Sequence, residues 1–306
     1  MKKFRIAILG IGGIGGYIGG KLAGLNHVLK ETIFIARGET LVKLRQDGLK
    51  LIMESGEVIV HPDLISDDPV QIGMVDLMVC SVKDFDLAVA LSRYSICLTD
   101  KSIIIPFQNG IGISDKIRGW LPHVDVWDAC IYVSARQVSR AVISQSGMKP
   151  EIYFGSDTTS PRNISQVESL FKSAGLPASP CQNMRAELWK KFFFISVMAT
   201  ATSYYNSTIG EIRSDPGKIE TVRALLFELR RISELEDANL PEDFYVTAYQ
   251  RIINLPPDST TSMYADFQKG GLTEVEYLTG DVVRLGEVHG ISTPVYRMMY
   301  ERLKQR

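Results

Sequence analysis

Residues 4–24 read FRIAILGIGGIGGYIGGKLAG, an apolar run that passes directly into a series of glycines. The glycines fit the pattern GxGxxG, which follows a buried strand and opens a helix in dinucleotide-binding proteins. In that setting Gly10 allows the tight turn, Gly12 lets the backbone approach a pyrophosphate, and Gly15 lets the helix pack closely on the strand. The stretch therefore predicts a phosphate-binding turn, against the alternative of a glycine turn without a ligand. The turn comprises Gly10, Ile11, Gly12, Gly13, Ile14 and Gly15.

Beyond this turn, short β-branched runs alternate with helical stretches through the first half of the chain. The runs 74–82 (MVDLMVCSV) and 102–107 (SIIIPF) are apolar enough for buried strands of a parallel sheet. Two runs that flank Glu54-Ser55-Gly56, at 49–53 and 57–61, predict a hairpin. Such alternation predicts an α/β fold, an N-terminal Rossmann-type doubly wound parallel sheet.

The second half of the chain has a different pattern, with long amphipathic stretches and no comparable β alternation. We expect helices at 185–203, 218–238, 242–254 and 272–289. The sequence thus predicts two domains: a dinucleotide-binding Rossmann-type domain over 1–182 and an all-helical (all-α) domain over 183–306.

Composition narrows the class of protein. The 306 residues carry a net charge of -1, which argues against a large nucleic-acid surface, and no apolar run is long enough to span a membrane. The four cysteines form no CxxC pair, so neither a zinc ribbon nor a disulfide scaffold is expected, and no metal site is predicted. Glycines interrupt the apolar run at the N-terminus, which disfavours a secretion signal and favours a cytoplasmic protein.

The end of the second expected strand indicates which dinucleotide would bind. An NAD site usually has Asp or Glu there, which binds the ribose 2′-OH. Here TIFIARGE ends in Arg37, and a guanidinium suits a 2′-phosphate. Glu39 is the rival candidate, but it lies past the strand end, after Gly38. We therefore expect NADPH as the cofactor; an ordinary solvated arginine is the alternative.

Polar side chains follow two other expected strands. Lys83 ends VCSVK, and Gln108 and Asn109 precede Gly110 in SIIIPFQNG. Ligands of open α/β sheets bind at the carboxyl ends of strands, so these residues are cofactor-site candidates, although Asn-Gly is also a common turn. None of the four histidines has a candidate catalytic neighbour, which directs the search for a proton donor to lysine or a carboxylic acid.

These features together resemble the ketopantoate reductase (2-dehydropantoate 2-reductase) family over nearly the whole chain. The resemblance rests on the glycine turn, Arg37, SVK at Lys83 and QNG at 108–110. In the second half it rests on ELWKK ending at Lys191, on TSMYADFQKGGLTEVEYLTG at 261–280, and on HGISTPVY from His289.

The resemblance implies NADPH-dependent reduction of a 2-oxo acid to a 2-hydroxy acid, here 2-dehydropantoate to pantoate in pantothenate biosynthesis. It implies a substrate held between a Rossmann domain and a helical domain. Lys191 would give the proton to the carbonyl, and Glu274 and Ser262 would line the pocket for substrate and nicotinamide. Asn109 would touch both ligands. Lys83, and Ala135 from the SAR stretch, would lie beside the cofactor.

The chemistry agrees with that assignment. Hydride delivery to a carbonyl carbon builds negative charge on the oxygen, which a nearby ammonium stabilises and protonates. A catalytic lysine needs its pKa lowered by partial burial, which aromatic neighbours provide. Trp189, Phe192 and Phe193 are such neighbours of Lys191. The alternative is that Lys190 and Lys191 lie on a solvated helix face.

The chain also departs from the family pattern. The family usually has asparagines four and eight positions after the lysine and a third beyond the helix, and here these are Ile195, Ala199 and Ile209. Thr202 returns to nearly the same helix face and would partly replace them. Two alternatives therefore stay open: a paralogue that reduces a more apolar 2-oxo acid, and a non-catalytic NADP(H)-binding sensor.

Apolar residues of the helical half, such as Met298, would serve either the core or a homodimer.

Overall fold

The computed structural model describes residues 3–25, 27–147, 149–156 and 159–306. The chain forms two compact units. The N-terminal unit comprises the chain up to Gln108 together with Gly112–Met184, and the helical unit comprises Asn109–Ile111 together with Arg185–Arg306. Within the described ranges, no helix has both the length and the apolar character that a membrane span requires.

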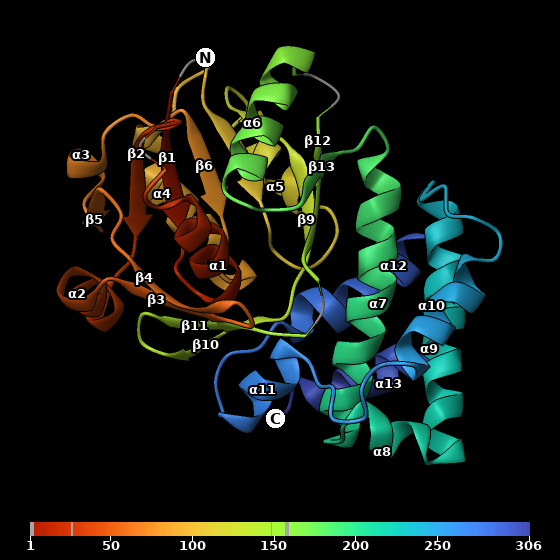
Figure 1. The fold of residues 1–306 in the computed structure, drawn as a ribbon. Helices are drawn as coiled ribbons and strands as arrows, with labels where there is room; N and C mark the ends of the chain where they lie inside the picture. Colours follow the sequence, from red (N-terminus) through yellow and green to blue (C-terminus); the bar gives the residue numbers. More distant parts are fainter. Residues whose placement is uncertain (1–2, 26, 148, 157–158) are drawn as a thin grey trace. The chain divides into compact units, whose positions relative to one another are not determined.

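The N-terminal unit is built on a six-stranded sheet with the order β5-β2-β1-β6-β7-β8, in which every neighbouring pair is parallel (Figure 1). Its strands are apolar because both faces are covered. The strands are β1 (Phe4–Leu9), β2 (Leu29–Ile35), β5 (Leu64–Ser66), β6 (Leu77–Cys80), β7 (Ile103–Pro106) and β8 (Asp125–Val126). This order, with the first strand in the middle, confirms the expected doubly wound α/β fold.

Helices cover both faces of this sheet. Ile6 and Ile8 of β1 pack into one hydrophobic cluster with residues of α1 and α6, while Ala7 and Leu9 pack into another with residues of α3, α4 and α5. These helices are α1 (Gly13–Leu22), α3 (Pro69–Ile72), α4 (Asp84–Tyr94), α5 (Ile113–Trp120) and α6 (Pro161–Ser173), and α2 (Gly38–Asp47) also contributes Leu44 to the first cluster. The alternating side chains of β1 therefore anchor both layers.

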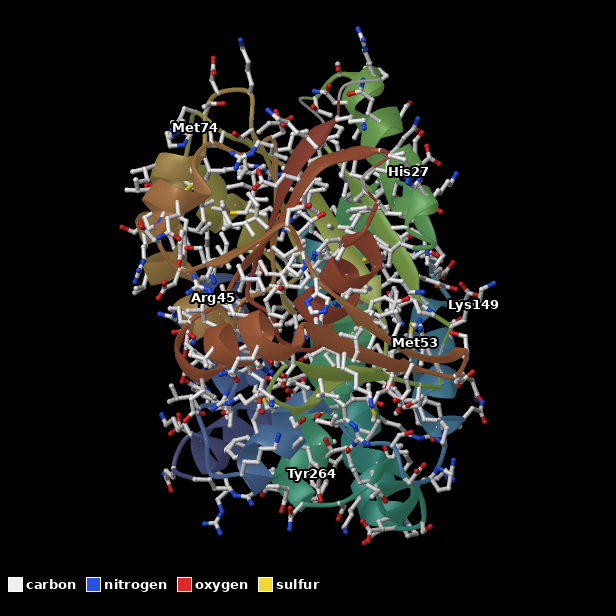
Figure 2. The ribbon with its side chains drawn as sticks, turned by 60° about the vertical axis from the view of Figure 1, so that its left-hand side comes forward. His27, Arg45, Met53, Met74, Lys149 and Tyr264 are labelled. Atoms are coloured by element: carbon white, nitrogen blue, oxygen red, sulfur yellow. The ribbon has the colours of Figure 1, made fainter. Side chains whose placement is uncertain are left out.

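Two smaller sheets complete the unit. The sheet β10-β11-β3-β4 includes the expected hairpin of β3 (Leu49–Met53, with Met53 labelled in Figure 2) and β4 (Gly56–Val60). It also includes β10 (Ala135–Ser139) and β11 (Val142–Gln145), which the sequence pattern did not indicate. The third sheet consists of β9 (Asp128–Tyr132), β12 (Glu151–Gly155) and β13 (Ala178–Pro180).

Helix α1 lies between two of these sheets, which explains its glycines. A Cβ at Gly19 would lie 2.9 Å from Phe34 and 3.1 Å from Ile8, on the central sheet. On another side of the helix, a Cβ at Gly16 would lie 2.5 Å from Ile143, and one at Gly20 would lie 2.5 Å from Leu51. Such distances leave no room for side chains, so the glycines let the helix contact both sheets at backbone distance.

The helical unit contains the long helices that the sequence predicts, with α7 running through its core. Its apolar cluster includes Trp189, Phe192 and Phe193 from α7 together with Leu225, Leu229 and Tyr296 from other helices. The helices are α7 (Met184–Tyr205), α8 (Ile209–Arg213), α9 (Pro216–Leu235), α10 (Phe244–Ile253), α11 (Ser262–Gln268), α12 (Asp281–Val288) and α13 (Pro294–Leu303), with a π-helical turn, η2 (Glu276–Gly280), before α12.

One expected helix differs from the structure. The amphipathic pattern predicts a continuous helix over 272–289, but residues 271–273 are irregular and the segment begins with the π-helical turn. Gly270 has φ +66 and Gly271 follows it, so the chain leaves the preceding helix here. The extra residue in the turn changes the phase of the helix, which an ideal periodicity of ~3.6 residues per turn does not describe.

A buried carboxylate fixes the last helix to the unit. Glu228 of α9 is buried, and its two oxygens accept hydrogen bonds from the backbone N–H groups of Val295 (2.8 Å) and Tyr296 (3.0 Å). These groups belong to the first turn of α13, where Pro294 supplies no N–H. The negative charge also interacts favourably with the helix dipole. Burial nevertheless raises the pKa of the Glu228 carboxyl.

We expect Glu228→Ala to lower the free energy of unfolding by about 2–4 kcal/mol, because two buried N–H groups lose a charged acceptor. The matched control is Glu220→Ala on the same helix, which removes only an exposed ion pair with Arg223 and should cost less than ~0.5 kcal/mol. Urea unfolding monitored by circular dichroism measures both values. Equal losses for the two variants would contradict this account of α13.

The same carboxyl predicts a pH dependence. A raised pKa means that the folded chain binds the Glu228 proton more tightly than the unfolded chain, so the associated stability is full below the usual pKa of 4.5 and is lost as the pH rises through the folded value. The stability advantage of the wild type over Glu228→Gln should therefore grow as the pH falls from neutral toward 4.5.

Candidate active site

The glycine turn lies at the carboxyl end of β1, in the middle of the central sheet. Gly10 has φ +96, a conformation that side chains rarely adopt, and a Cβ there would lie 2.8 Å from Val82. A Cβ at Gly15 would lie 2.0 Å from the Gly10 carbonyl oxygen and 2.1 Å from Ser81 Oγ. These two positions hold strand, turn and helix at backbone contact, and only glycine fits them.

Gly12, unlike Gly10 and Gly15, has open space where a side chain would lie. It precedes the first turn of α1 with φ -91, and no described atom lies within 4 Å of a Cβ built on it. The backbone is thus open on this side, where the first N–H groups of α1 begin. Ile11 is buried in the core of the N-terminal unit and Ile14 packs against it, so they anchor the turn. This arrangement fits a pyrophosphate bound at the helix N-terminus.

The strand β10 closes one side of the turn. A Cβ on Gly13 would lie 2.3 Å from the Ala135 carbonyl oxygen and 3.2 Å from the Cα of Arg136. The structure therefore places Ala135, a cofactor-site candidate from the sequence, directly against the glycine turn.

Arg37 lies after β2, with its side chain about half exposed and its Nη2 3.9 Å from a carboxylate oxygen of Asp86. The rival candidate Glu39 forms an ion pair with Arg140, 3.3 Å apart, and both side chains are exposed. Glu39 is therefore paired with Arg140, while the Arg37 guanidinium lies at the end of β2.

The ends of β6 and β7 are linked by Gln108. Its Nε2 donates to the Val82 carbonyl (3.1 Å) and to Cys80 Sγ (3.3 Å), while its Oε1 is buried with no hydrogen-bond partner among the described residues. Burial raises the pKa of the Cys80 thiol to about 12, so this cysteine stays protonated at neutral pH and is a poor nucleophile. Gln108 thus braces the strand end that carries Lys83.

Lys83 is half-buried and precedes the first turn of α4, where its carbonyl accepts from the Asp86 amide at 2.9 Å. Ser81, two residues earlier, was not a sequence candidate. Its Oγ donates to the Gly10 carbonyl at 2.8 Å and so fixes the glycine turn to β6. Its only signal in the sequence is its place at the end of an apolar strand.

Asn109 is half-buried in a bend, and with the next two residues it groups with the helical unit. Ile111 packs against the hydrophobic cluster of that unit. Gly110 has φ +118 and Gly112 has φ +70, so the chain needs glycine on both sides of Ile111 to follow this path.

Lys191 is buried in the helical unit, with 7% of its surface exposed. It lies on α7, two residues after Trp189 and two before Phe193, and the rings of these two residues contact each other edge to face. The structure therefore contradicts a solvated helix face for Lys191 but not for Lys190, which is half-buried and pairs with Glu187 at 2.7 Å. Lysine is almost never buried without a structural or functional reason.

The positions one and two turns beyond Lys191 carry no hydrogen-bonding side chains. Ile195 packs against the hydrophobic cluster, and Ala199 and Ile209 are fully buried within it. Thr202 is fully buried too, and its hydroxyl donates to the carbonyl of Met198 at 2.7 Å. The Thr202 proton is thus used within its own helix.

Thr202 nevertheless reaches the segment that carries Ser262. Its Oγ1 lies 3.3 Å from that of Thr261, which caps α11 by accepting from the amide of Tyr264 at 3.2 Å (Tyr264 is labelled in Figure 2). Ser262 is the first residue of this helix and is exposed. The structure thus brings Thr202 to the N-terminus of the helix that presents Ser262.

Glu274 is buried, with 3% of its surface exposed, two residues before the π-helical turn. Its carbonyl accepts from the amides of Tyr277 (3.1 Å) and Leu278 (2.9 Å). Val275, which follows Glu274, and Phe192, which follows Lys191, belong to the same hydrophobic cluster. Both candidate catalytic groups therefore come from segments packed into the core of one unit.

The fold is of the Rossmann type, with a parallel-sheet unit followed by an all-helical unit. Profiles of two families match the chain: "Ketopantoate reductase PanE/ApbA" over residues 6–158 and "Ketopantoate reductase PanE/ApbA C terminal" over residues 183–306. The chain belongs to the ketopantoate reductase family, and it is a 2-dehydropantoate 2-reductase-like oxidoreductase with a nicotinamide cofactor.

Individual relatives are distant in sequence but match from end to end. A 2-dehydropantoate 2-reductase from Halobacterium salinarum is 26% identical, with 99% of each chain covered. A PanE/ApbA family ketopantoate reductase from Ralstonia eutropha JMP134 superposes with a TM-score of 0.90 at 26% identity, covering 98% of this chain and 97% of that one. A D-mandelate dehydrogenase, solved with NADH and anilino(oxo)acetate, shares the fold at 19% identity with a TM-score of 0.87, covering 98% and 97%.

Gly12→Ala should leave the stability of the fold unchanged and weaken nucleotide binding. A methyl group at this position meets no described atom within 4 Å, so the midpoint of thermal unfolding should change by less than ~2 °C. The methyl group would occupy the open side of the turn, so the Kd for NADPH, measured by fluorescence titration, should rise at least tenfold.

The control is Gly15→Ala, whose methyl group would collide with the Gly10 carbonyl and should lower the unfolding temperature itself. An unchanged Kd in Gly12→Ala would remove the turn from the nucleotide site.

Proposed function

We propose that this chain reduces a 2-oxo acid to a 2-hydroxy acid with NADPH, and that 2-dehydropantoate is its first candidate substrate. The observation that carries the proposal is the burial of Lys191 on α7 in the helical unit. A lysine is almost never buried without a partner or a functional role. Family membership supports the same reaction class.

In this proposal Lys191 acts as the general acid. NADPH, when bound, would supply the hydride for the carbonyl carbon. Negative charge then develops on the carbonyl oxygen, and the Lys191 ammonium donates a hydrogen bond and finally its proton to that oxygen. The 2-oxo acid thereby gains a hydride and a proton and becomes the 2-hydroxy acid. Burial of Lys191 strengthens its electrostatic effect, because little water screens it.

Glu274 and Ser262 complete the substrate side of the proposed site. Glu274 is buried, so its carboxylate would hold a ligand or nicotinamide group with little competition from water. Ser262 is exposed at the start of α11, where its hydroxyl is available to a ligand. Asn109, half-buried in the bend before Gly110, would orient substrate and nicotinamide with its amide group.

The cofactor side of the proposed site favours NADPH. The open backbone at Gly12 and the N–H groups of α1 fit the pyrophosphate, with Ala135 beside the turn and Lys83 and Gln108 at neighbouring strand ends. Arg37 would bind the 2′-phosphate as a charge-assisted pair. Glu39, which would favour the 2′-OH of NADH, is engaged by Arg140.

A more apolar 2-oxo acid is the second candidate substrate. Ile195 and Ala199 offer no hydrogen bonds one and two turns beyond Lys191, and the Thr202 hydroxyl is used by Met198. A substrate with a polar side chain would leave its groups unpaired against such a wall, at a cost of ~1–3 kcal/mol each. The D-mandelate dehydrogenase of the same fold indicates that this architecture accommodates substrates other than 2-dehydropantoate.

Arg37→Asp should weaken NADPH binding while sparing NADH. Loss of a charge-assisted contact and the addition of a repelling carboxylate should raise the Kd for NADPH about 100-fold or more, and the Kd for NADH should change less than about threefold. Fluorescence titration of both nucleotides measures the ratio. The control is Arg140→Ala, which leaves Arg37 in place. If the Kd for NADPH and the Kd for NADH change by the same factor, Arg37 does not bind the 2′-phosphate.

Lys191→Ala should bind NADPH like the wild type and lose turnover by about 10³-fold or more, because it removes the proton donor. The control is Lys190→Ala, which removes the neighbouring ammonium and its pair with Glu187. Loss of NADPH absorbance measures turnover with 2-dehydropantoate, 2-oxo-isovalerate and pyruvate as substrates. Wild-type turnover in Lys191→Ala would overturn the proposed mechanism.

The three acids also separate the substrate candidates. Preference of the wild type for 2-dehydropantoate supports the first candidate, and turnover of only the less polar acids supports the second. Absence of turnover with all three would reject 2-dehydropantoate as the substrate, and would leave a 2-oxo acid outside this panel or the non-catalytic NADP(H)-binding sensor.

A further inference from the structure

The candidate Glu274 lies two residues before a π-helical turn, Glu276–Gly280, with Val275 between them. In this turn the amide of Asp281 donates to the carbonyl of Glu276, five residues earlier. A π-helical turn is less favourable than an α-helical one, and such turns concentrate at functional sites. Contacts from outside the segment must therefore stabilise it.

The buried side of the turn is held by α7. Ser196 Oγ donates to the Leu278 carbonyl at 2.6 Å and lies 2.8 Å from the hydroxyl of Tyr296. A hydroxyl has one proton, and Ser196 gives its own to Leu278, so the Tyr296 hydroxyl is the donor to Ser196. Burial raises the pKa of Tyr296, which keeps this donor protonated. One turn further along α7, Thr200 Oγ1 lies 2.8 Å from Thr279 Oγ1.

These contacts are strong because water does not compete with them. Ser196, Thr200, Thr279 and Tyr296 have no exposed surface. A hydrogen bond in such surroundings is electrostatically stronger than one at the surface, and an unmade one is costly. The turn is thus fixed to α7 at two successive residues, Leu278 and Thr279.

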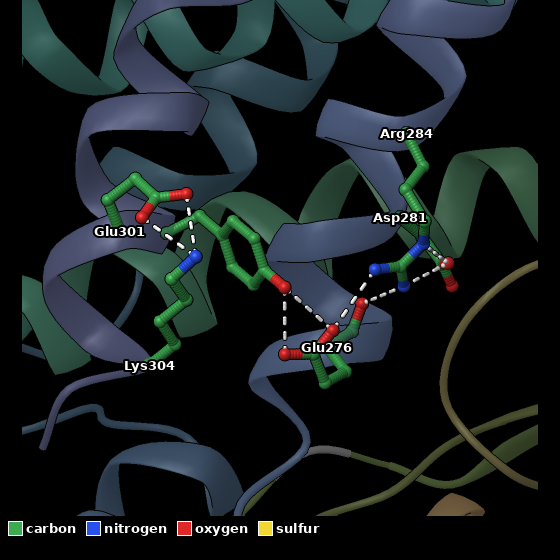
Figure 3. Close-up of polar contacts among 6 residues, drawn as sticks. Glu276, Asp281, Arg284, Glu301 and Lys304 are labelled. Atoms are coloured by element: carbon green, nitrogen blue, oxygen red, sulfur yellow. Dashed lines mark hydrogen bonds and ion pairs between the residues drawn. The ribbon is translucent and has the colours of Figure 1, made fainter.

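The other side of the turn is held by α12 and α13 (Figure 3). The Tyr300 hydroxyl donates to the Glu276 carboxylate at 2.8 Å, and Arg284 donates to the Glu276 carboxylate (3.0 Å) and carbonyl (2.6 Å). A Cβ at Gly280 would lie 2.9 Å from the Tyr300 ring and 3.0 Å from Arg284, so a larger residue would force these two side chains to shift. These groups are partly exposed, so each contact contributes less than the buried ones.

The helix that holds the turn also carries Lys191. Ser196 and Thr200 follow Lys191 by five and nine residues on the continuous helix α7. A helix is rigid over this length of ~14 Å. The same element therefore carries one candidate catalytic group and fixes the segment that begins with the other.

We propose that Ser196 and Thr200 are positioning residues, which set the place of Glu274 through the π-helical turn. They touch neither substrate nor cofactor. This inference rests on the proposed function, in which Glu274 contacts the reacting ligands.

The first test measures the turn itself, without reference to turnover. Hydrogen exchange of the amides of 276–281 should be at least tenfold faster in Ser196→Ala and in the isosteric Thr200→Val than in the wild type. Thr200→Ser keeps the hydroxyl and should restore slow exchange. The control is Ser233→Ala, which removes a buried hydroxyl that donates to the carbonyl of Arg230 on α9. Unchanged exchange in both Ser196→Ala and Thr200→Val would overturn the proposal.

The second test is a double-mutant cycle on kcat, with the 2-oxo acid that the wild type reduces. Ser196→Ala and Thr200→Val should lower kcat at least tenfold with the Kd for NADPH unchanged, and Ser233→Ala should change kcat less than twofold. In the Glu274→Gln background the same substitutions should cost less than twofold, because they act through Glu274. If the double variants lose kcat by the product of the losses of the two single variants, the proposal is wrong.

The two proposals fail in different ways. Wild-type turnover in Glu274→Gln would remove Glu274 from the proposed function, whatever Ser196 does. Loss of turnover in Glu274→Gln together with wild-type kcat in Thr200→Val would leave the proposed function intact and reject the positioning role.

Discussion

The N-terminal unit depends on the contact of α1 with two sheets at backbone distance. On the central sheet, Gly15 lies against the Gly10 carbonyl and Ser81; on the second sheet, Gly16 and Gly20 lie against Ile143 and Leu51. Any side chain at these positions would displace the helix by more than a close-packed core tolerates. The first N–H groups of α1 are therefore held at the carboxyl ends of the strands by this packing and by the hydrogen bond from Ser81 to the Gly10 carbonyl.

The sequence predicts the part of this arrangement that is local. The apolar run 4–9 and the GxGxxG pattern lie side by side in the chain, so strand, turn and helix could be inferred together. The close packing at Gly13, Gly16 and Gly20 could not be inferred from the sequence. Their neighbours in the structure, which are Ala135, Ile143 and Leu51, lie far away in the chain. Strands β9 to β13 were missed for a similar reason, since they are short and gain their stability from pairing.

In the helical unit, too, the sequence predicts only what local patterns determine. The length and amphipathic pattern of the helices predict their existence, and burial of Lys191 agrees with its aromatic neighbours in the sequence. The π-helical turn after Glu274 was missed, because its stabilising partners Ser196 and Thr200 lie about 80 residues earlier in the chain. Local periodicity predicts an ordinary helix there, and tertiary hydrogen bonds override it.

The hydrogen bonds of α7 constrain what a substrate can meet there. The hydroxyls of Ser196, Thr200 and Thr202 are engaged by Leu278, Thr279 and Met198, and the side chains of Ile195 and Ala199 have no polar group. Lys191 is therefore the group of this helix that is suited to a carbonyl oxygen. Selectivity for a polar substrate side chain would have to come from other elements, such as the start of α11 with Ser262. The hydroxyls of Ser196, Thr200 and Thr202 thus serve the fold. In the proposed function, the chemistry at Lys191 is therefore separate from the recognition of the substrate side chain.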